Sequence, residues 1–134
     1  MIMFASTRIM AKLISAYGYQ GDAMNLPVAD VEMAMPFYLE KMGFSVAEQT
    51  REPVKKAVLE RDGVRFAIAE NGGDPEQDGC AFHTDDVHAL RDEFTGNGYK
   101  VGEIKAETRE DGSKFNAFFA IAPDGLCYWF GQRV

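Results

Sequence analysis

The chain has 134 residues, 46% of them hydrophobic and 12% aromatic, so it is long and apolar enough to bury one core. This composition excludes disordered, collagen-like and low-complexity proteins. The formal net charge of −7, from 14 Lys and Arg against 21 Asp and Glu, argues against a nucleic-acid partner, because phosphates repel an acidic protein.

The cysteines and the start of the chain indicate a cellular compartment. Cys80 and Cys127 are too few for a disulfide framework, and free thiols are typical of a reducing compartment such as the cytoplasm. No apolar run reaches the roughly 18 residues of a membrane-spanning helix, and the first basic residues follow an apolar group, the wrong order for a secretory signal. We therefore expect a cytoplasmic protein without membrane contact, with residues 1–21 as an N-terminal extension to a single domain over 22–134.

That domain repeats one pattern, over residues 22–70 and 79–131, and the polar segment 70–78 connects the two copies. Three matched pairs support the repeat: Asp30-Val31 with Asp86-Val87, Gly43-Phe44 with Gly98-Tyr99, and Asp62-Gly63 with Asp124-Gly125.

Each copy predicts one strand, one helix and three further strands. In chain order we expect strands at 22–29, 44–50, 54–60 and 64–70, and again at 79–84, 99–105, 115–121 and 126–131. Asp30 and Asp86 are placed to cap the two helices, and Gly43 and Gly98 to end them. Asp-Gly pairs are typical of tight hairpin turns. Pro36 falls within the first helix and should bend it or limit its regular part.

These elements predict an α+β fold of two βαβββ units that form a half-open barrel with a central cleft. The helix of one unit covers one face of its sheet, so the other face needs the second unit as a partner. Alternate strand residues share a face. One set of alternate residues should pack under the helices, including Leu26, Phe66, Phe82, Tyr128 and Phe130. The other set should line the cleft, where ligand sites commonly lie.

The segments DVEMAMPFYLEKMGF (30–44) and APDGLCYWF (122–130) resemble the glyoxalase/bleomycin resistance/extradiol dioxygenase superfamily, also called the vicinal oxygen chelate proteins. The resemblance covers residues 22–131. It implies this fold, a homodimer and, in the enzymes, one divalent metal held by His or Gln on the first strand and Glu on the last strand of each unit.

The metal-ligand positions of that family fall on residues that cannot bind a metal. Counting from the capping and turn aspartates, they are Ala23 and Ala67 in the first copy and Gly79 and Trp129 in the second. None of these offers a metal-binding nitrogen, oxygen or sulfur side chain. We therefore expect no metal and no other cofactor.

Five candidate pocket residues remain on the cleft phase: Asn25, Arg65, His83, Cys127 and Trp129. Trp129 either stacks on an aromatic or cationic ligand or simply fills the cleft. His83 is a general base or a polar residue hydrogen-bonded to the backbone at a strand end, and Cys127 has only His83 as a partner for nucleophilic chemistry. Arg65 pairs with an anionic group of a ligand or is an exposed charge, and Asn25 orients a ligand.

The leading hypothesis is a metal-free small-molecule binding protein similar to the bleomycin-resistance branch, which sequesters basic, partly planar drugs between subunits. Its ligand would be aromatic or cationic, and the net charge of −7 favours a cation. One alternative is a lyase, isomerase or dioxygenase with a degenerate metal site, which leaves open whether the chain is an enzyme. A second alternative is an interaction module that binds a partner through its acidic face.

Overall fold

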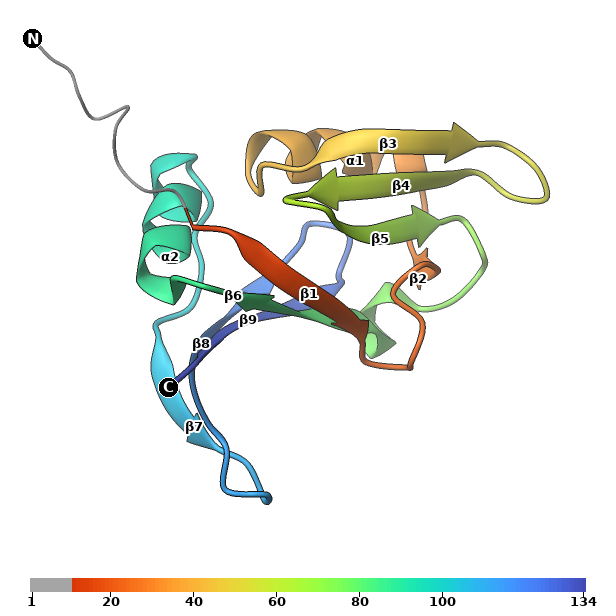
Figure 1. Cartoon of the computed structure of the whole chain (residues 1–134). Coiled ribbons are helices and arrows are strands. Elements are labelled where there is room, and N and C mark those ends of the chain that lie inside the picture. Colours follow the sequence, from red (N-terminus) through yellow and green to blue (C-terminus); the bar gives the residue numbers. More distant parts are fainter. Residues whose placement is uncertain (1–10) are drawn as a thin grey trace, which may run out of the picture.

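The computed structural model describes residues 11–134, which form two sheets and two helices (Figure 1). The elements are β1 (Leu13–Gly18), β2 (Leu26–Pro27), α1 (Val31–Glu40), β3 (Ser45–Thr50), β4 (Lys56–Arg61), β5 (Val64–Ala69), a short 3-10 helix (Pro75–Gln77), β6 (Gly79–Thr84), α2 (Val87–Gly96), β7 (Lys105–Thr108), β8 (Lys114–Ile121) and β9 (Cys127–Arg133). The five-stranded sheet has the order β1-β6-β9-β8-β7, and the four-stranded sheet the order β2-β5-β4-β3. No helix of the described residues is long and apolar enough to cross a membrane.

The α+β class is confirmed, and the βαβββ order is present in both halves. In each half the first strand pairs in parallel with the last, β2 with β5 and β6 with β9, while the other pairs of the unit are antiparallel. A parallel pair needs a crossover connection, and in the second half α2 lies on this path. The repeat that the sequence predicts is therefore a repeat of topology.

The helix ends are where the capping residues predict them. The carboxylates of Asp30 and Asp86 each accept a hydrogen bond from the amide three residues on, at 3.1 and 3.0 Å. Gly43 and Gly98 follow the two helices with φ of 74° and 83°, a conformation that favours glycine. Pro36 lies inside α1 and does not end it.

An edge strand of the five-stranded sheet, β1, lies before the boundary expected at residue 22. It pairs with β6 from Leu13 to Gly18, and the Leu13 amide donates to the carboxylate of Asp62 at 2.9 Å. The sequence gives little sign of this strand, since Ile14 and Tyr17 are both 62% exposed and the order comes from distant partners. Residues 1–10 of the expected extension lie outside the described residues.

Two other strands differ from their predicted extents. The first strand of the repeat shrinks to β2, because residues 21–25 form a bent turn in which the Met24 amide donates to Asp22 at 2.9 Å. The strand expected at 99–105 begins only at Lys105, because the chain before it runs irregularly beside β8. There the Gly102 amide donates a hydrogen bond to the Phe119 carbonyl at 2.9 Å.

One apolar core fills the space between the two sheets. Phe66 of the four-stranded sheet packs against Phe82 and Tyr128 of the five-stranded sheet, with ring centroids 5.3 and 5.9 Å apart. The residues predicted to lie under the helices join this core, including Leu26 and Phe130. The two halves of one chain thus meet through their apolar faces, and the faces expected to line a cleft between them point outward.

Polar contacts also connect the halves. Arg61 at the end of β4 makes two hydrogen bonds of 2.7 Å to the carboxylate of Glu93 on α2, and both side chains are largely buried. The helix ends exchange contacts: the Lys41 ammonium donates to the Asn97 carbonyl at 2.8 Å, and the Asn97 amide donates to the Lys41 carbonyl at 3.1 Å. The two units are therefore joined around the rim of the core as well as through it.

A polar group is enclosed at one end of the core. The Tyr38 hydroxyl lies 2.7 Å from the Asp124 carboxylate and 2.6 Å from the Tyr128 hydroxyl. Burial raises the pKa of the Asp124 carboxyl, although hydrogen bonds from the Leu126 amide and Tyr38 act against this. These bonds satisfy the buried oxygens of the turn before β9.

Candidate ligand-binding site

The outer face of the five-stranded sheet carries an aromatic cluster. Trp129 of β9 is only 4% exposed and packs against Phe115 of β8 and His83 of β6, with ring centroids 5.6 and 5.2 Å apart. Successive strand residues face opposite ways, so this cluster is separate from the core between the sheets.

Neighbouring residues bury the Trp129 side chain almost completely. Its ring lies so close to Gly131 that a Cβ there would clash with it, and its indole N–H donates to Glu107 at 3.1 Å. The Arg109 guanidinium lies 5.0 Å from the ring centroid. The Trp129 ring is thus enclosed by Glu107, Arg109 and Gly131.

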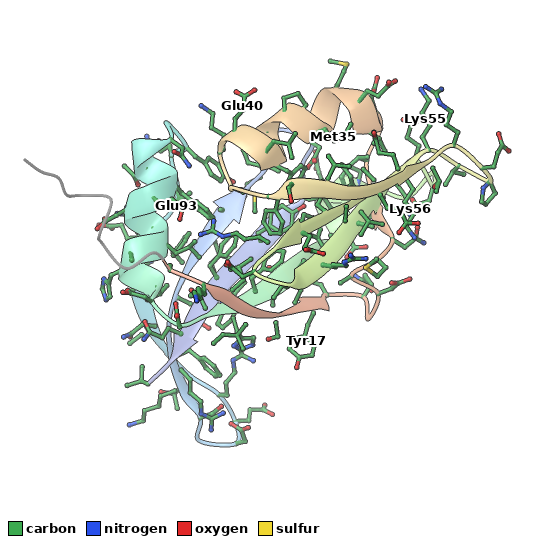
Figure 2. The ribbon with its side chains drawn as sticks, turned by 45° about the horizontal axis from the view of Figure 1, so that its top comes forward. Tyr17, Met35, Glu40, Lys55, Lys56 and Glu93 are labelled. Carbon is green, nitrogen blue, oxygen red and sulfur yellow. The ribbon has the colours of Figure 1, made fainter. Side chains whose placement is uncertain are left out.

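His83 is a half-buried polar group of this cluster. Its half-buried ring meets Tyr17 edge-on at 5.9 Å, and Tyr17 extends outward from β1 (Figure 2). Burial lowers the pKa of the imidazole, and the charges of Arg109 and Arg133 lower it further. His83 is therefore neutral at pH 7 and can accept or donate a hydrogen bond, and among residues 11–134 it makes none.

Cys127 lies on the same face beside a second blocked position. The Tyr19 hydroxyl approaches its sulfur at 4.0 Å, and the Tyr19 ring covers Gly79 so closely that any side chain there would clash. Cys80 points into the core, where burial raises the pKa of its thiol to about 12. The two cysteines thus lie on opposite faces and are both free.

Asn25, in the turn before β2, and Arg65 of β5 lie at the other sheet. Asn25 is exposed and borders a cavity of about 400 Å³, formed with residues of β3, β4 and the loop between them. Arg65 is exposed and pairs with Glu60 at 2.6 Å, which is the exposed-charge alternative. The five predicted residues therefore divide between the outer faces of two sheets, with the shared core between them.

The family's metal does not fit the residues at its usual positions. Ala23, Ala67 and Gly79 lack donor atoms, and the Trp129 indole donates only hydrogen bonds. Among residues 11–134 no three His, Cys, Asp or Glu side chains are grouped closely enough to hold a metal ion.

Several exposed apolar residues of this face were missed by the sequence analysis. Phe119 and Ile121 of β8 are 51% and 65% exposed, in phase with Phe115, and Tyr17 is exposed at the sheet edge. The alternation of side-chain faces along β8 could have predicted the positions of Phe119 and Ile121. Tyr17 and Tyr19 were beyond reach, because β1 and the residue after it pair with residues about 65 positions away.

Comparison with known families decides the assignment. A family model described as Glyoxalase/Bleomycin resistance protein/Dioxygenase superfamily matches residues 21–126. The chain belongs to this superfamily. Within the superfamily, our chain lacks the donor atoms at its four metal-ligand positions. A comparison with curated protein sequences gives no match.

Solved structures of superfamily members and related folds resemble the chain at low identity. A virulence protein from Salmonella typhimurium is 21% identical with a TM-score of 0.65, and the match covers 84% of this chain and 95% of that one. The bleomycin resistance determinant encoded on the transposon Tn5 is 22% identical, with a TM-score of 0.61 and coverage of 81% and 93%. TnmS3, an antibiotic binding protein from a Streptomyces species, is 20% identical, with a TM-score of 0.61 and coverage of 83% and 93%. At these identities the likeness supports the fold.

Proposed function

We propose that the chain binds a small organic molecule on the outer face of the five-stranded sheet and sequesters it without a metal. The observation that supports this most is the exposed apolar surface on that face. Tyr17, Phe119 and Ile121 are each more than half exposed on this face, and Tyr17 meets the half-buried ring of His83. Grouped apolar side chains on a soluble protein mark a binding surface.

The chemistry of this face favours an aromatic ligand over a cationic one. Arg109 and Arg133 lie beside the ring of His83 and repel a cation there. Neutral His83 supplies a hydrogen bond that fixes the ligand's orientation, and the aromatic edges supply contact area. We therefore narrow the expected ligand to a planar aromatic molecule.

Sequestration fits these residues better than metal-dependent catalysis. An enzyme of this superfamily that used a metal here would need ligands other than Ala23, Ala67, Gly79 and Trp129. The similarity to an antibiotic binding protein and to a bleomycin resistance determinant agrees with a binding role.

We further propose that the protein acts as a cytoplasmic homodimer. Since one core lies between the two sheets, a single chain cannot close both outer faces around one ligand. A second copy would bring the outer face of its four-stranded sheet, with Asn25 and Arg65, opposite His83 and Phe119. Sedimentation at micromolar concentration tests this, and a monomer with full ligand affinity would contradict it.

A thermal-shift screen tests the binding function, with bleomycins, planar aromatic acids and divalent metals as probes. A ligand at a hundred times its dissociation constant adds about 2.7 kcal/mol to the free energy of unfolding. We expect an aromatic compound to raise the melting temperature, and Phe119→Ser to abolish that rise. Met33→Ser is the matched control, because Met33 is 80% exposed on α1, away from this face. A strong response to one metal and none to the aromatic compounds would overturn the proposal.

A further inference from the structure

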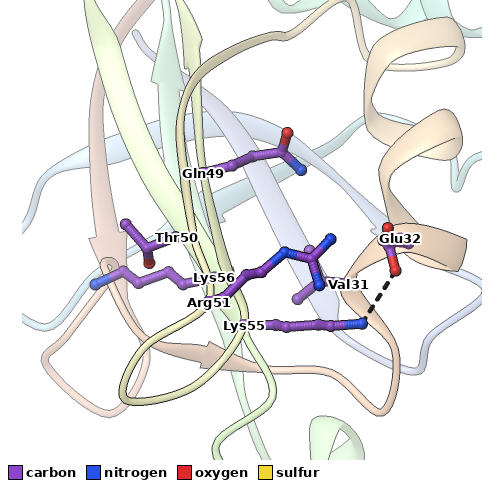
Figure 3. A pocket seen from close by; sticks show the side chains of 7 residues that line it. All are labelled: Val31, Glu32, Gln49, Thr50, Arg51, Lys55 and Lys56. Carbon is purple, nitrogen blue, oxygen red and sulfur yellow. Dashed lines mark hydrogen bonds and ion pairs between the residues drawn. The ribbon is translucent and has the colours of Figure 1, made fainter.

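A second pocket lies between the start of α1 and the tip of the β3–β4 hairpin (Figure 3). Its volume is about 310 Å³, and it is lined by Val31, Glu32, Gln49, Thr50, Arg51, Lys55 and Lys56. Small-molecule pockets begin at about 300 Å³, so there is room for one small ligand. Gln49 contacts Met35 of α1, which places the pocket on the helix side of the four-stranded sheet, away from the face proposed above.

The pocket concentrates positive charge in an acidic protein. Three of the chain's 14 Lys and Arg residues lie between positions 51 and 56. Arg51 takes part in none of the ion pairs found within residues 11–134, whereas Lys55 pairs with Glu32 at 3.1 Å. Arg51, Lys55 and the Gln49 amide reach toward α1, while Lys56 extends the opposite way (Figure 3).

These groups suit a phosphate oxyanion. A guanidinium presents a planar set of N–H donors that matches phosphate oxygens in pairs, and an ammonium adds a point charge. The N-terminal end of α1 adds a partial positive field. Two of its first amides are engaged within the protein, since the Val31 N–H donates to Glu70 and the Met33 N–H donates to Asp30. The ligand contacts would therefore come from Arg51, Lys55 and the Gln49 amide.

We propose that this pocket binds the phosphate group of a small phosphorylated molecule. Arg51 holds the phosphate, Lys55 turns from Glu32 to the ligand, and the rest of the pocket, beside Gln49 and Thr50, receives the organic part. Glu32 is the competing anion: its side chain is 60% exposed, so it can leave Lys55 at little cost. Removing the carboxylate should therefore strengthen binding, an effect that a purely structural ion pair would not produce.

NMR titration of the whole chain with phenyl phosphate and with inorganic phosphate tests the proposal. We expect saturable shifts at the start of α1, with phenyl phosphate the tighter ligand. Arg51→Gln and Lys55→Gln should each weaken binding about tenfold, as for the loss of one charge-assisted contact, and Glu32→Gln should tighten it. Lys100→Gln, which removes an exposed cation after α2 that does not line the pocket, should change nothing.

Three results would overturn the site. The first is the absence of saturable shifts with either probe, and the second is an equal effect of Lys100→Gln and Lys55→Gln. The third is equal affinity for inorganic phosphate and phenyl phosphate, which would show that the pocket does not recognise the organic part of the ligand. Because every substituted side chain is at least partly exposed, unchanged melting temperatures should show that the variants fold.

Discussion

Glu93→Gln should destabilise the chain far more than an exposed substitution of the same kind. The side chains of Arg61 and Glu93 are only 8% and 16% exposed, and two charge-assisted hydrogen bonds of 2.7 Å join them. Glutamine keeps the shape and one acceptor but loses the charge that balances the buried guanidinium. Removing one partner of a buried pair costs about 3–5 kcal/mol. Since Asp62 still lies 3.3 Å from Arg61, we expect the lower end, about 3 kcal/mol.

Urea unfolding followed by circular dichroism measures this loss. With a slope of about 2 kcal/mol per molar urea, the midpoint should fall by about 1.5 M. The matched control is Glu60→Gln, which breaks the exposed pair with Arg65 and should cost at most about 1 kcal/mol. Equal losses in the two variants would refute the assigned role of burial. The apolar double variant Arg61→Met/Glu93→Leu should lose less than Glu93→Gln alone, because no buried charge is left unpaired.

Three further substitutions test separate parts of the fold. Asp86→Ala removes the cap of α2 and should lower the free energy of unfolding by about 1 kcal/mol in urea titrations; no loss would contradict the cap. Gly131→Ala drives a methyl group into the Trp129 ring and should cost about 1–3 kcal/mol, and the same change should cost less when made in a Trp129→Ala variant. Burial raises the folded-state pKa of Asp124, so stability should fall as pH rises from about 4, the unfolded value, through the raised folded value. Asp124→Asn should flatten that dependence, and an unchanged slope between pH 4 and 7 would disprove it.

Local chemistry made much of the fold predictable. Asp30 and Asp86 cap helices and Gly43 and Gly98 end them because these roles depend on a few neighbouring residues. The alternation of β5, β6 and β9 placed side chains on the correct face of each sheet. The repeat of these local signals was enough to predict two βαβββ units.

The relation between the two units was not predictable in the same way. Which faces meet depends on contacts such as Phe66 with Phe82, and neither sequence periodicity nor capping records such a pairing. The strand β1 was missed for the same reason, since its register is set by β6. For the candidate site, the phase of His83 and Trp129 was right, but the cover over Trp129 comes from Glu107 and Arg109 of a hairpin whose curvature the sequence does not specify.

The core shared by the two units has a consequence for how the chain loses its structure. In arrays of repeats, each unit touches only its neighbours and can melt separately. Here the inner face of each sheet is shielded from water by the other, through rings such as Phe66 and Tyr128, so neither unit keeps a protected interior when its partner opens. A duplicated chain of this kind should open in one all-or-none event, with the slowest-exchanging amides drawn equally from β5 and β9.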